Sequence, residues 1–179
     1  NLHRAAQIIV ERHGGQLPDD LQALQALPGI GRYTAGAILA FAFDRPAPIV
    51  EANTLRLYSR LLAFDGDPRS ANGQQRLWAF AESIQPRRAP GSFNQALIDL
   101  GATVCIPSAP DCSRCPVQSL CAARSLNRQH EIPVMPRRSE MTELTECLVA
   151  VHDRGRYLLR RCRPDERWAG LWDFPRFAV

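Results

Sequence analysis

The sequence predicts a mainly α-helical protein that continues into the start of a small α/β domain. Three observations support this fold class. Apolar residues recur at helical spacing as far as residue 104, four cysteines follow closely, and an alternating, β-branched pattern begins after Thr142. We therefore expect a helical domain over 1–104, a cysteine loop over 105–121, a linker over 122–143 and the truncated start of a second domain over 144–179.

The composition is that of a globular protein with a modest excess of positive charge. With 179 residues, 45% of them hydrophobic, the chain can bury a core, and no apolar run is long enough to cross a bilayer. A net charge of +4 is compatible with a polyanionic partner. All 22 basic residues are arginine, which binds phosphate bidentately but cannot form a Schiff base. Lysine-based covalent chemistry is therefore excluded for this chain.

Several helices are predicted in the first 104 residues. Each has apolar residues on one face and a recognisable start or stop, such as Gly14-Gly15 after the first helix and Ser92 as the N-cap of the last. They are expected over 2–13, from Pro18 to Leu27, and over 34–43, 51–63, 74–84 and 92–104.

A glycine turn, Pro28-Gly29-Ile30-Gly31, joins two of these helices into a hairpin. Glycine permits positive φ and a close backbone approach, and the following helix offers unpaired N–H groups to an anion such as phosphate. Glycine-rich helix turns also arise for packing alone, so the turn by itself is a moderate signal. The residues that we expect to contact DNA here are Gly29, Ile30, Gly31, Arg32 and Thr34.

A carboxylate, Glu51, comes at the start of the next predicted helix. Two interpretations are open: an acid that merely complements the helix dipole, or a catalytic acid held in place by it. Its position shortly after a candidate phosphate-binding hairpin favours the second interpretation.

The four clustered cysteines are the strongest signal in the chain. Cys105, Cys112, Cys115 and Cys121 have a 6-2-5 spacing, and without a secretory signal they indicate a metal centre in preference to disulfides. Four thiolates suit either zinc or an iron-sulfur cluster. The asymmetric spacing favours one bulky centre wrapped by a single loop.

The last part of the chain changes character twice. Residues 122–143 lack apolar periodicity and carry arginines and prolines, which predicts a basic linker. After it, TECLVAVHDRGRYLLRRC predicts two strands joined by a turn at 153–156.

Taken together, these residues resemble the MutY-type adenine DNA glycosylases, within the helix-hairpin-helix superfamily that includes endonuclease III. The resemblance rests on LPGIGRYTAGAI, IVEANTLRLYSRL, FNQALIDLGATVC with its cysteine loop, and ERWAGLWDFPRF. It implies a 4Fe-4S cluster on Cys105, Cys112, Cys115 and Cys121, and a Nudix-like second domain. It also implies base flipping and hydrolysis of the N-glycosidic bond of adenine mispaired with 8-oxoguanine or guanine in double-stranded DNA.

The resemblance also implies roles for three residues. Glu51 takes the place of the family's catalytic aspartate, Asn53 that of its neighbouring asparagine, and Tyr33 the site where lyase-type relatives have a lysine nucleophile. The absence of lysine then implies a monofunctional glycosylase. The family has Asp-Gly where this chain has Glu51-Ala52, and the extra methylene displaces the carboxylate by about 1.5 Å. The family's proton-donating glutamate lies before the region that matches Asn1.

Two alternatives remain at this point. One is a DNA-binding relative without catalysis, and the other is a sister glycosylase for a different mismatched base. For the preferred interpretation we expect a monomeric cytoplasmic protein, bacterial and associated with the nucleoid, that has no membrane partner.

Overall fold

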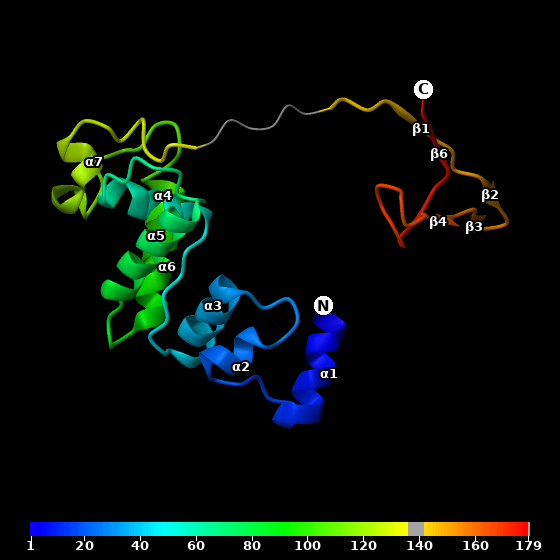
Figure 1. The fold of residues 1–179 in the computed structure, drawn as a ribbon, viewed down its shortest axis with the longest axis horizontal. Helices are drawn as coiled ribbons and strands as arrows, with labels where there is room; N and C mark the ends of the chain where they lie inside the picture. Colours follow the sequence, from blue (N-terminus) through cyan, green and yellow to red (C-terminus); the bar gives the residue numbers. More distant parts are fainter. Residues whose placement is uncertain (136–141, 179) are drawn as a thin grey trace. The chain divides into compact units, whose positions relative to one another are not determined.

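A computed structural model describes residues 1–135 and 142–178, in which the chain forms two compact units, Asn1–Pro136 and Arg137–Val179 (Figure 1). The first unit is helical and the second contains short strands. The helices of the first unit are α1 (Leu2–His13), α2 (Leu21–Gln25), α3 (Arg32–Phe43), α4 (Ala52–Leu61), α5 (Ala71–Ser83), α6 (Pro90–Thr103), the 3₁₀ helix η1 (Gln118–Leu120) and α7 (Ala122–Ser125).

The first three helices enclose a small core of their own. Helix α1 ends at Gly14, whose left-handed backbone (φ 62°) closes the last turn, and α2 begins at Asp20, whose side chain accepts a hydrogen bond from the Ala23 amide. Helices α2 and α3 then form the predicted hairpin. The buried residues of this core come from α1, the hairpin and the segment after α3, namely Ala5, Leu24, Leu27, Ala35, Leu39 and Ala47.

Helices α4, α5 and α6 enclose a second core, which includes Leu57, Tyr58, Leu77, Trp78 and Leu97. The rings of Tyr58 and Phe80 meet edge-to-face with 5.4 Å between centroids. Helix α6 packs against both α3 and α4 and therefore joins the two cores. The glycine turn and the start of α4 are thus fixed on one helical framework.

The segment after the cysteines differs from the predicted linker. Residues 122–125 form α7, which contacts α4, and the side chains of Ala123 and Ile132 are fully or almost fully buried. Arg60 Nε donates a hydrogen bond of 2.8 Å to the Ile132 carbonyl. The sequence shows no apolar periodicity here because single buried residues and main-chain hydrogen bonds hold the segment. Residues 136–141 of the predicted linker lie outside the described residues.

The described residues of the second unit form three two-stranded antiparallel sheets. The strands are β1 (Glu146–Leu148), β2 (His152–Asp153), β3 (Arg156–Tyr157), β4 (Arg160–Arg161), β5 (Trp172–Asp173) and β6 (Arg176–Ala178), paired as β1–β6, β2–β3 and β4–β5. The predicted turn at 153–156 is present, with Arg154 and Gly155 both at positive φ. The predicted long first strand is wrong: it divides, and β1 pairs instead with β6.

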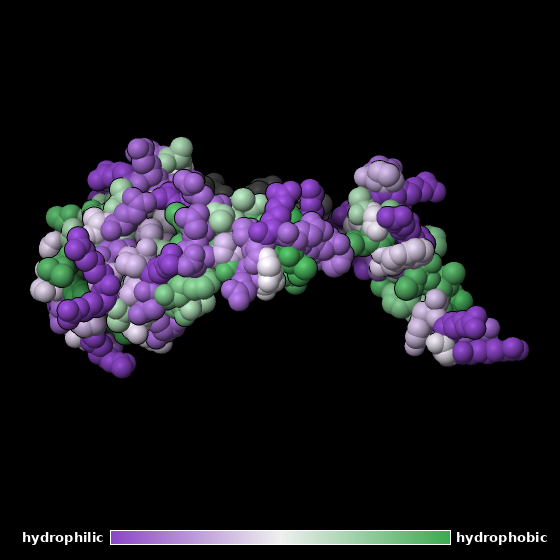
Figure 2. Space-filling model, turned by 90° about the horizontal axis from the view of Figure 1, so that it is seen from below, coloured by the Kyte–Doolittle hydropathy of each residue, from purple (hydrophilic) through white to green (hydrophobic). Residues whose placement is uncertain are grey.

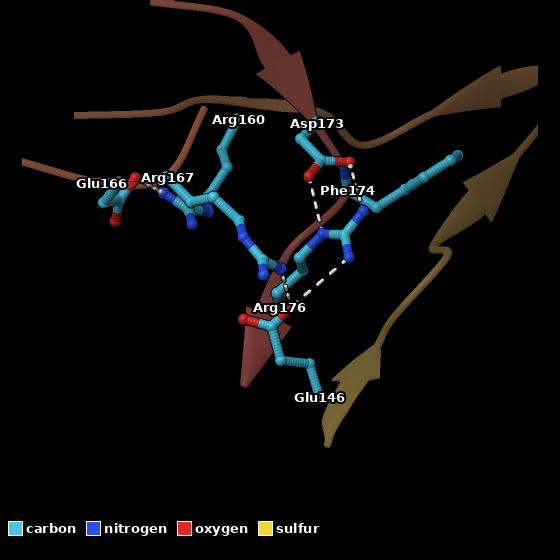
Figure 3. A network of polar contacts seen from close by, with 7 residues as sticks. All are labelled: Glu146, Arg160, Glu166, Arg167, Asp173, Phe174 and Arg176. Atoms are coloured by element: carbon cyan, nitrogen blue, oxygen red, sulfur yellow. Dashed lines mark hydrogen bonds and ion pairs between the residues drawn. The ribbon is translucent and has the colours of Figure 1, made fainter. Parts of the chain in front are cut away.

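Ion pairs connect the strands of this unit (Figure 3). The Arg176 guanidinium pairs with Asp173 at 2.6 Å and with Glu146 at 3.5 Å, and Arg160 pairs with Glu166. Large apolar side chains reach its surface, where hydrophobic patches are visible (Figure 2), and Trp172, Tyr157 and Leu171 are all more than half exposed. Among the described residues, no helix has both the length and the hydropathy needed to cross a membrane.

Candidate functional site

Glu51 is the N-cap of α4, and its carboxylate is held in place by the helix. Its Oε1 accepts hydrogen bonds from the backbone amides of Asn53 (2.9 Å) and Thr54 (2.8 Å). In return the Glu51 amide donates to Thr54 Oγ1 at 2.9 Å, which completes a capping box. The hydrogen bonds described for this carboxylate all end on Oε1, so Oε2 is left for another group. The residue is half-buried, which keeps it reachable from outside.

Asn53 follows Glu51 on the first turn of α4, and its side chain is oriented by an arginine. Its Oδ1 accepts a hydrogen bond of 3.0 Å from Arg56 Nη2. The structure therefore brings together two of the three residues expected to be catalytic. The capping box holds Glu51, and the Arg56 guanidinium orients Asn53.

Arg56 also connects this turn to α6 and to the cysteine loop. Its Nη2 donates to the Gly101 carbonyl at 2.6 Å and its Nε to the Cys105 carbonyl at 2.7 Å. Only 9% of the Arg56 surface is exposed. Burial lowers the pKa of its guanidinium, and the nearby Cys105 thiol acts in the opposite direction.

Arg60, one turn further along α4, makes a second connection to the loop. Its guanidinium donates to the carbonyls of Ile106 (2.7 Å) and Pro107 (2.8 Å) and to Cys105 Sγ (3.3 Å), and it is 2% exposed. The sequence alone did not reveal this function of Arg56 and Arg60. Two arginines at i and i+4 on a helix that must be buried are the signal that could have revealed it.

Gly101 allows α6 to approach the start of α4 closely. A Cβ at this position would lie 2.8 Å from the Asn53 Cβ and 2.9 Å from the Asn53 carbonyl oxygen. Glycine is therefore required where the two helices cross beside Asn53.

The glycine turn presents an open surface at the start of α3. Gly29 has φ 87°, which favours glycine, and Gly31 is the N-cap of α3 without any side-chain cap. A Cβ at Gly31 would meet nothing within 4 Å. Thr34 is exposed and Ile30 is half-buried beneath the turn. The first amides of α3 have no side-chain cap and are the groups that an anion could bind here, while the Asn1 side chain packs against Gly29.

Arg32 and Tyr33 both lie on the first turn of α3, and they have different surroundings. The Arg32 guanidinium lies 4.0 Å from the centre of the Trp78 ring and pairs with Glu82, so it is engaged with α5 and not free at the turn. Tyr33 is 38% exposed on the first turn of α3. Among the described residues no hydrogen bond joins Tyr33 to Glu51 or Asn53.

All four clustered cysteines line one pocket beside α4. The pocket is also bordered by residues of α4, the loop and α7, including Leu57, Arg60, Arg124 and Gln129. Each of the six cysteines is free, so the sequence does not form a disulfide framework. Within residues 1–135 and 142–178, no three His, Cys, Asp or Glu side chains are close enough to share a single metal ion.

The donor set nevertheless fits a centre larger than one ion. Burial raises the pKa of the Cys112 and Cys115 thiols, and the other thiols of the pocket raise it further. Metal ligation requires the thiolate, so a centre bound in this pocket would have to offset the raised pKa of these two thiols. Four cysteines around one pocket fit an iron-sulfur cluster, and Cys105, Cys112, Cys115 and Cys121 are its candidate ligands.

Comparisons with known proteins show what this chain is similar to. Residues 12–41 match the helix-hairpin-helix motif, which covers α2, the glycine turn and most of α3. The chain is 43% identical over 143 residues to the adenine DNA glycosylase of Mus musculus, and 39% identical over 178 residues to that of Homo sapiens. The chain is related to the adenine DNA glycosylases. A third such glycosylase, from Buchnera aphidicola, is 31% identical over 177 residues.

These alignments include most of the chain but a smaller part of each adenine DNA glycosylase. They cover 79%, 99% and 99% of the chain, respectively. The chain spans 28% of the mouse protein, 32% of the human protein and 51% of the Buchnera protein.

The fold of this chain is also similar to that of solved structures. A thermostable thymine-DNA glycosylase has a TM-score of 0.62 and 30% identity, over 70% of this chain and 57% of that one. Endonuclease III in a non-covalent DNA complex has a TM-score of 0.58 and 24% identity, over 71% and 57% respectively. The helical unit therefore has the helix-hairpin-helix glycosylase fold.

Proposed function

We propose that this protein removes adenine from double-stranded DNA where it is mispaired with 8-oxoguanine or guanine, by hydrolysis of the N-glycosidic bond. The observation that carries the proposal is the Glu51 carboxylate, which is fixed by two amide hydrogen bonds on one oxygen and keeps the other oxygen for substrate. The relation to adenine DNA glycosylases supports adenine as the base.

The proposed chemistry follows from the charge that develops in the reaction. As the bond between adenine and its sugar breaks, positive charge builds on the sugar, and an anion held beside it stabilises the transition state. Glu51 Oε2 supplies that anion without reorganisation, since the capping box already fixes the carboxylate. The same carboxylate can orient the attacking water, while Asn53, held by Arg56, hydrogen bonds to the sugar-phosphate of the extruded nucleotide.

The hairpin binds the DNA backbone in this proposal. A phosphate of the backbone binds the exposed amides at the start of α3, where the helix dipole favours negative charge. Gly29 and Gly31 let the phosphate approach the main chain closely, and Ile30 anchors the turn to the core.

The cysteine loop binds a 4Fe-4S cluster in this proposal, with Cys105, Cys112, Cys115 and Cys121 as ligands. When bound, the cluster supplies a rigid, anionic centre that cross-links the loop. Arg60 donates to Cys105 Sγ and to two loop carbonyls, so its charge complements the thiolates and holds the loop against α4.

The reaction is proposed to stop at the abasic site. Strand cleavage by a lyase needs an amine nucleophile, and this chain contains no lysine. Tyr33, at the position that the resemblance assigns to that nucleophile, lies on α3 and has no basic nitrogen.

Single-turnover release of adenine from a duplex with one 8-oxoguanine:adenine pair tests the proposal. We expect release of free adenine, an intact strand until alkali is added, and no release of thymine from a guanine:thymine duplex. A second candidate, excision of thymine, is favoured by the similarity to the thymine-DNA glycosylase structure. Thymine release without adenine release would replace the proposed substrate with that one.

A further inference from the structure

Gln129 lies in the turn that follows α7 and lines the same pocket as the four cysteines. Its side-chain oxygen Oε1 is buried and has no hydrogen-bond partner in the described part of the chain. A buried acceptor without a partner costs free energy, so its presence beside a pocket calls for an explanation.

A carbonyl oxygen is a poor neighbour for cysteine sulfurs that ligate a centre, because the oxygen and the sulfurs are all hydrogen-bond acceptors. The oxygen and nitrogen of a side-chain amide are interchanged by a half-turn of the amide group, which leaves the rest of the side chain in place. With that half-turn, the buried position holds Nε2, which is a donor.

The other polar groups around the pocket already have partners. Gln118 Oε1 accepts from Arg124, and the Arg60 guanidinium donates to the loop carbonyls and to Cys105 Sγ. Among the described residues that line the pocket, Gln129 is the one with a buried side-chain oxygen that has no hydrogen-bond partner.

We propose that Gln129 donates an N–H···S hydrogen bond to the iron-sulfur centre and is a positioning residue that sets its reduction potential. This inference rests on the cluster of the proposed function. A donor to sulfur stabilises the more negative, reduced state, so the bond raises the reduction potential. Removing it should lower the equilibrium constant for reduction about tenfold, or about 59 mV for a one-electron couple.

The test compares Gln129→Met with Gln85→Met in anaerobically purified holoprotein. Gln85 is the matched control, because its Oε1 is also buried without a partner. Gln85 does not line the cysteine pocket, and its Nε2 donates a hydrogen bond to Asn94 Oδ1. Iron and sulfide analysis of the wild-type protein comes first, and the potential is then measured by voltammetry on DNA-coated electrodes.

We expect Gln129→Met to lower the potential and Gln85→Met to leave it unchanged. Equal potentials for wild type and Gln129→Met, with iron present in both, would overturn the role of Gln129 and leave the cluster standing. A wild-type protein with zinc and no iron would overturn both.

A measurement on unmutated Gln129 decides the case in which Gln129→Met does not assemble a centre. Two glutamines line the pocket, Gln118 and Gln129. In Gln118→Met protein with ¹⁵N in its glutamine side chains, Gln129 is therefore the labelled glutamine at the pocket. A ¹⁵N hyperfine coupling in pulsed EPR of its paramagnetic cluster supports the proposal, and its absence rejects it.

Discussion

Arg56 Nη2 lies 3.0 Å from Asn53 Oδ1 and 2.6 Å from the Gly101 carbonyl oxygen, so one buried guanidinium orients a candidate catalytic amide and ties it to the neighbouring helix. Its Nε contacts the carbonyl of Cys105, the first residue of the cysteine loop. The start of α4 and the loop are therefore connected through a single side chain.

Arg56→Lys is expected to weaken both the fold and the site. Lysine keeps the charge, but one ammonium cannot reach the Gly101 and Cys105 carbonyls and Asn53 together. Leaving buried carbonyls unsatisfied should lower the free energy of unfolding by about 2–4 kcal/mol. Urea unfolding measures this loss, and Arg69→Lys on an exposed loop is the control. A change within about 0.5 kcal/mol for Arg56→Lys would contradict the role given to it.

Gly101→Ala should displace the first turn of α4. The added Cβ would lie 2.8 Å from the Asn53 Cβ and 2.9 Å from its carbonyl oxygen, so main chain has to move. We expect a loss of about 1–3 kcal/mol in the free energy of unfolding and slower base release. Thermal unfolding and single-turnover kinetics report the two effects. Normal kinetics with an unchanged melting temperature would show that the helices do not meet as closely as described.

Gly31→Asp should separate stability from DNA binding. Aspartate is a better N-cap than glycine and finds open space at this position, so the free energy of unfolding should stay the same or rise by a few tenths of a kcal/mol. Its carboxylate would occupy the anion site and repel phosphate. We therefore expect about tenfold weaker binding in a fluorescence anisotropy titration at fixed salt. The control substitution Ala71→Asp adds the same charge at the exposed first residue of α5, outside the hairpin turn, and should leave affinity intact. Equal losses in both variants would indicate a general charge effect.

The acid–base behaviour of the second unit depends on Arg176. Its hydrogen bond to Asp173 holds the pKa of that carboxyl below its usual value. Because the pKa of Asp173 is lower in the folded state, the ion pair stabilises the fold at pH values above the unfolded-state pKa. This stabilisation is lost as the pH falls through the folded-state pKa. NMR titration of the Asp173 carboxyl should show this low pKa, and Arg176→Met should return it toward the ordinary value. An unchanged pKa in that variant would show that Arg176 is not the cause.

The helical framework was predictable because its signals are local. Gly14 ends α1 as expected, and the glycine turn lies inside a single motif. The expected N-cap at Ser92 is wrong, because α6 already begins at Pro90 with Ala89 as its N-cap. The burial of Arg56 and Arg60 was not predictable in this way, because the carbonyls of Gly101, Cys105 and Ile132 that accept from them lie 45 to 72 residues away in the sequence. The pairing of β1 with β6 was missed for the same reason: alternation marks a strand but does not identify a partner 28 or more residues distant.

For the candidate site, the sequence predicted where residues stand in the helices but not which side chains they contact. Glu51 was expected at a helix start, and it is the N-cap of α4. The interaction of Arg32 with Trp78 and Glu82 could not be expected, since α5 approaches the hairpin only in the folded chain. An arginine beside a glycine turn looks like a phosphate ligand until its partners are known.

The most direct test of the proposed function compares Glu51→Gln with wild type in single-turnover adenine release from an 8-oxoguanine:adenine duplex. Glutamine keeps the cap through its amide oxygen but removes the negative charge. We predict at least about a hundredfold slower release, with DNA affinity and iron content unchanged. Release at the wild-type rate would contradict the account, since Glu51 would then be a helix cap and no more.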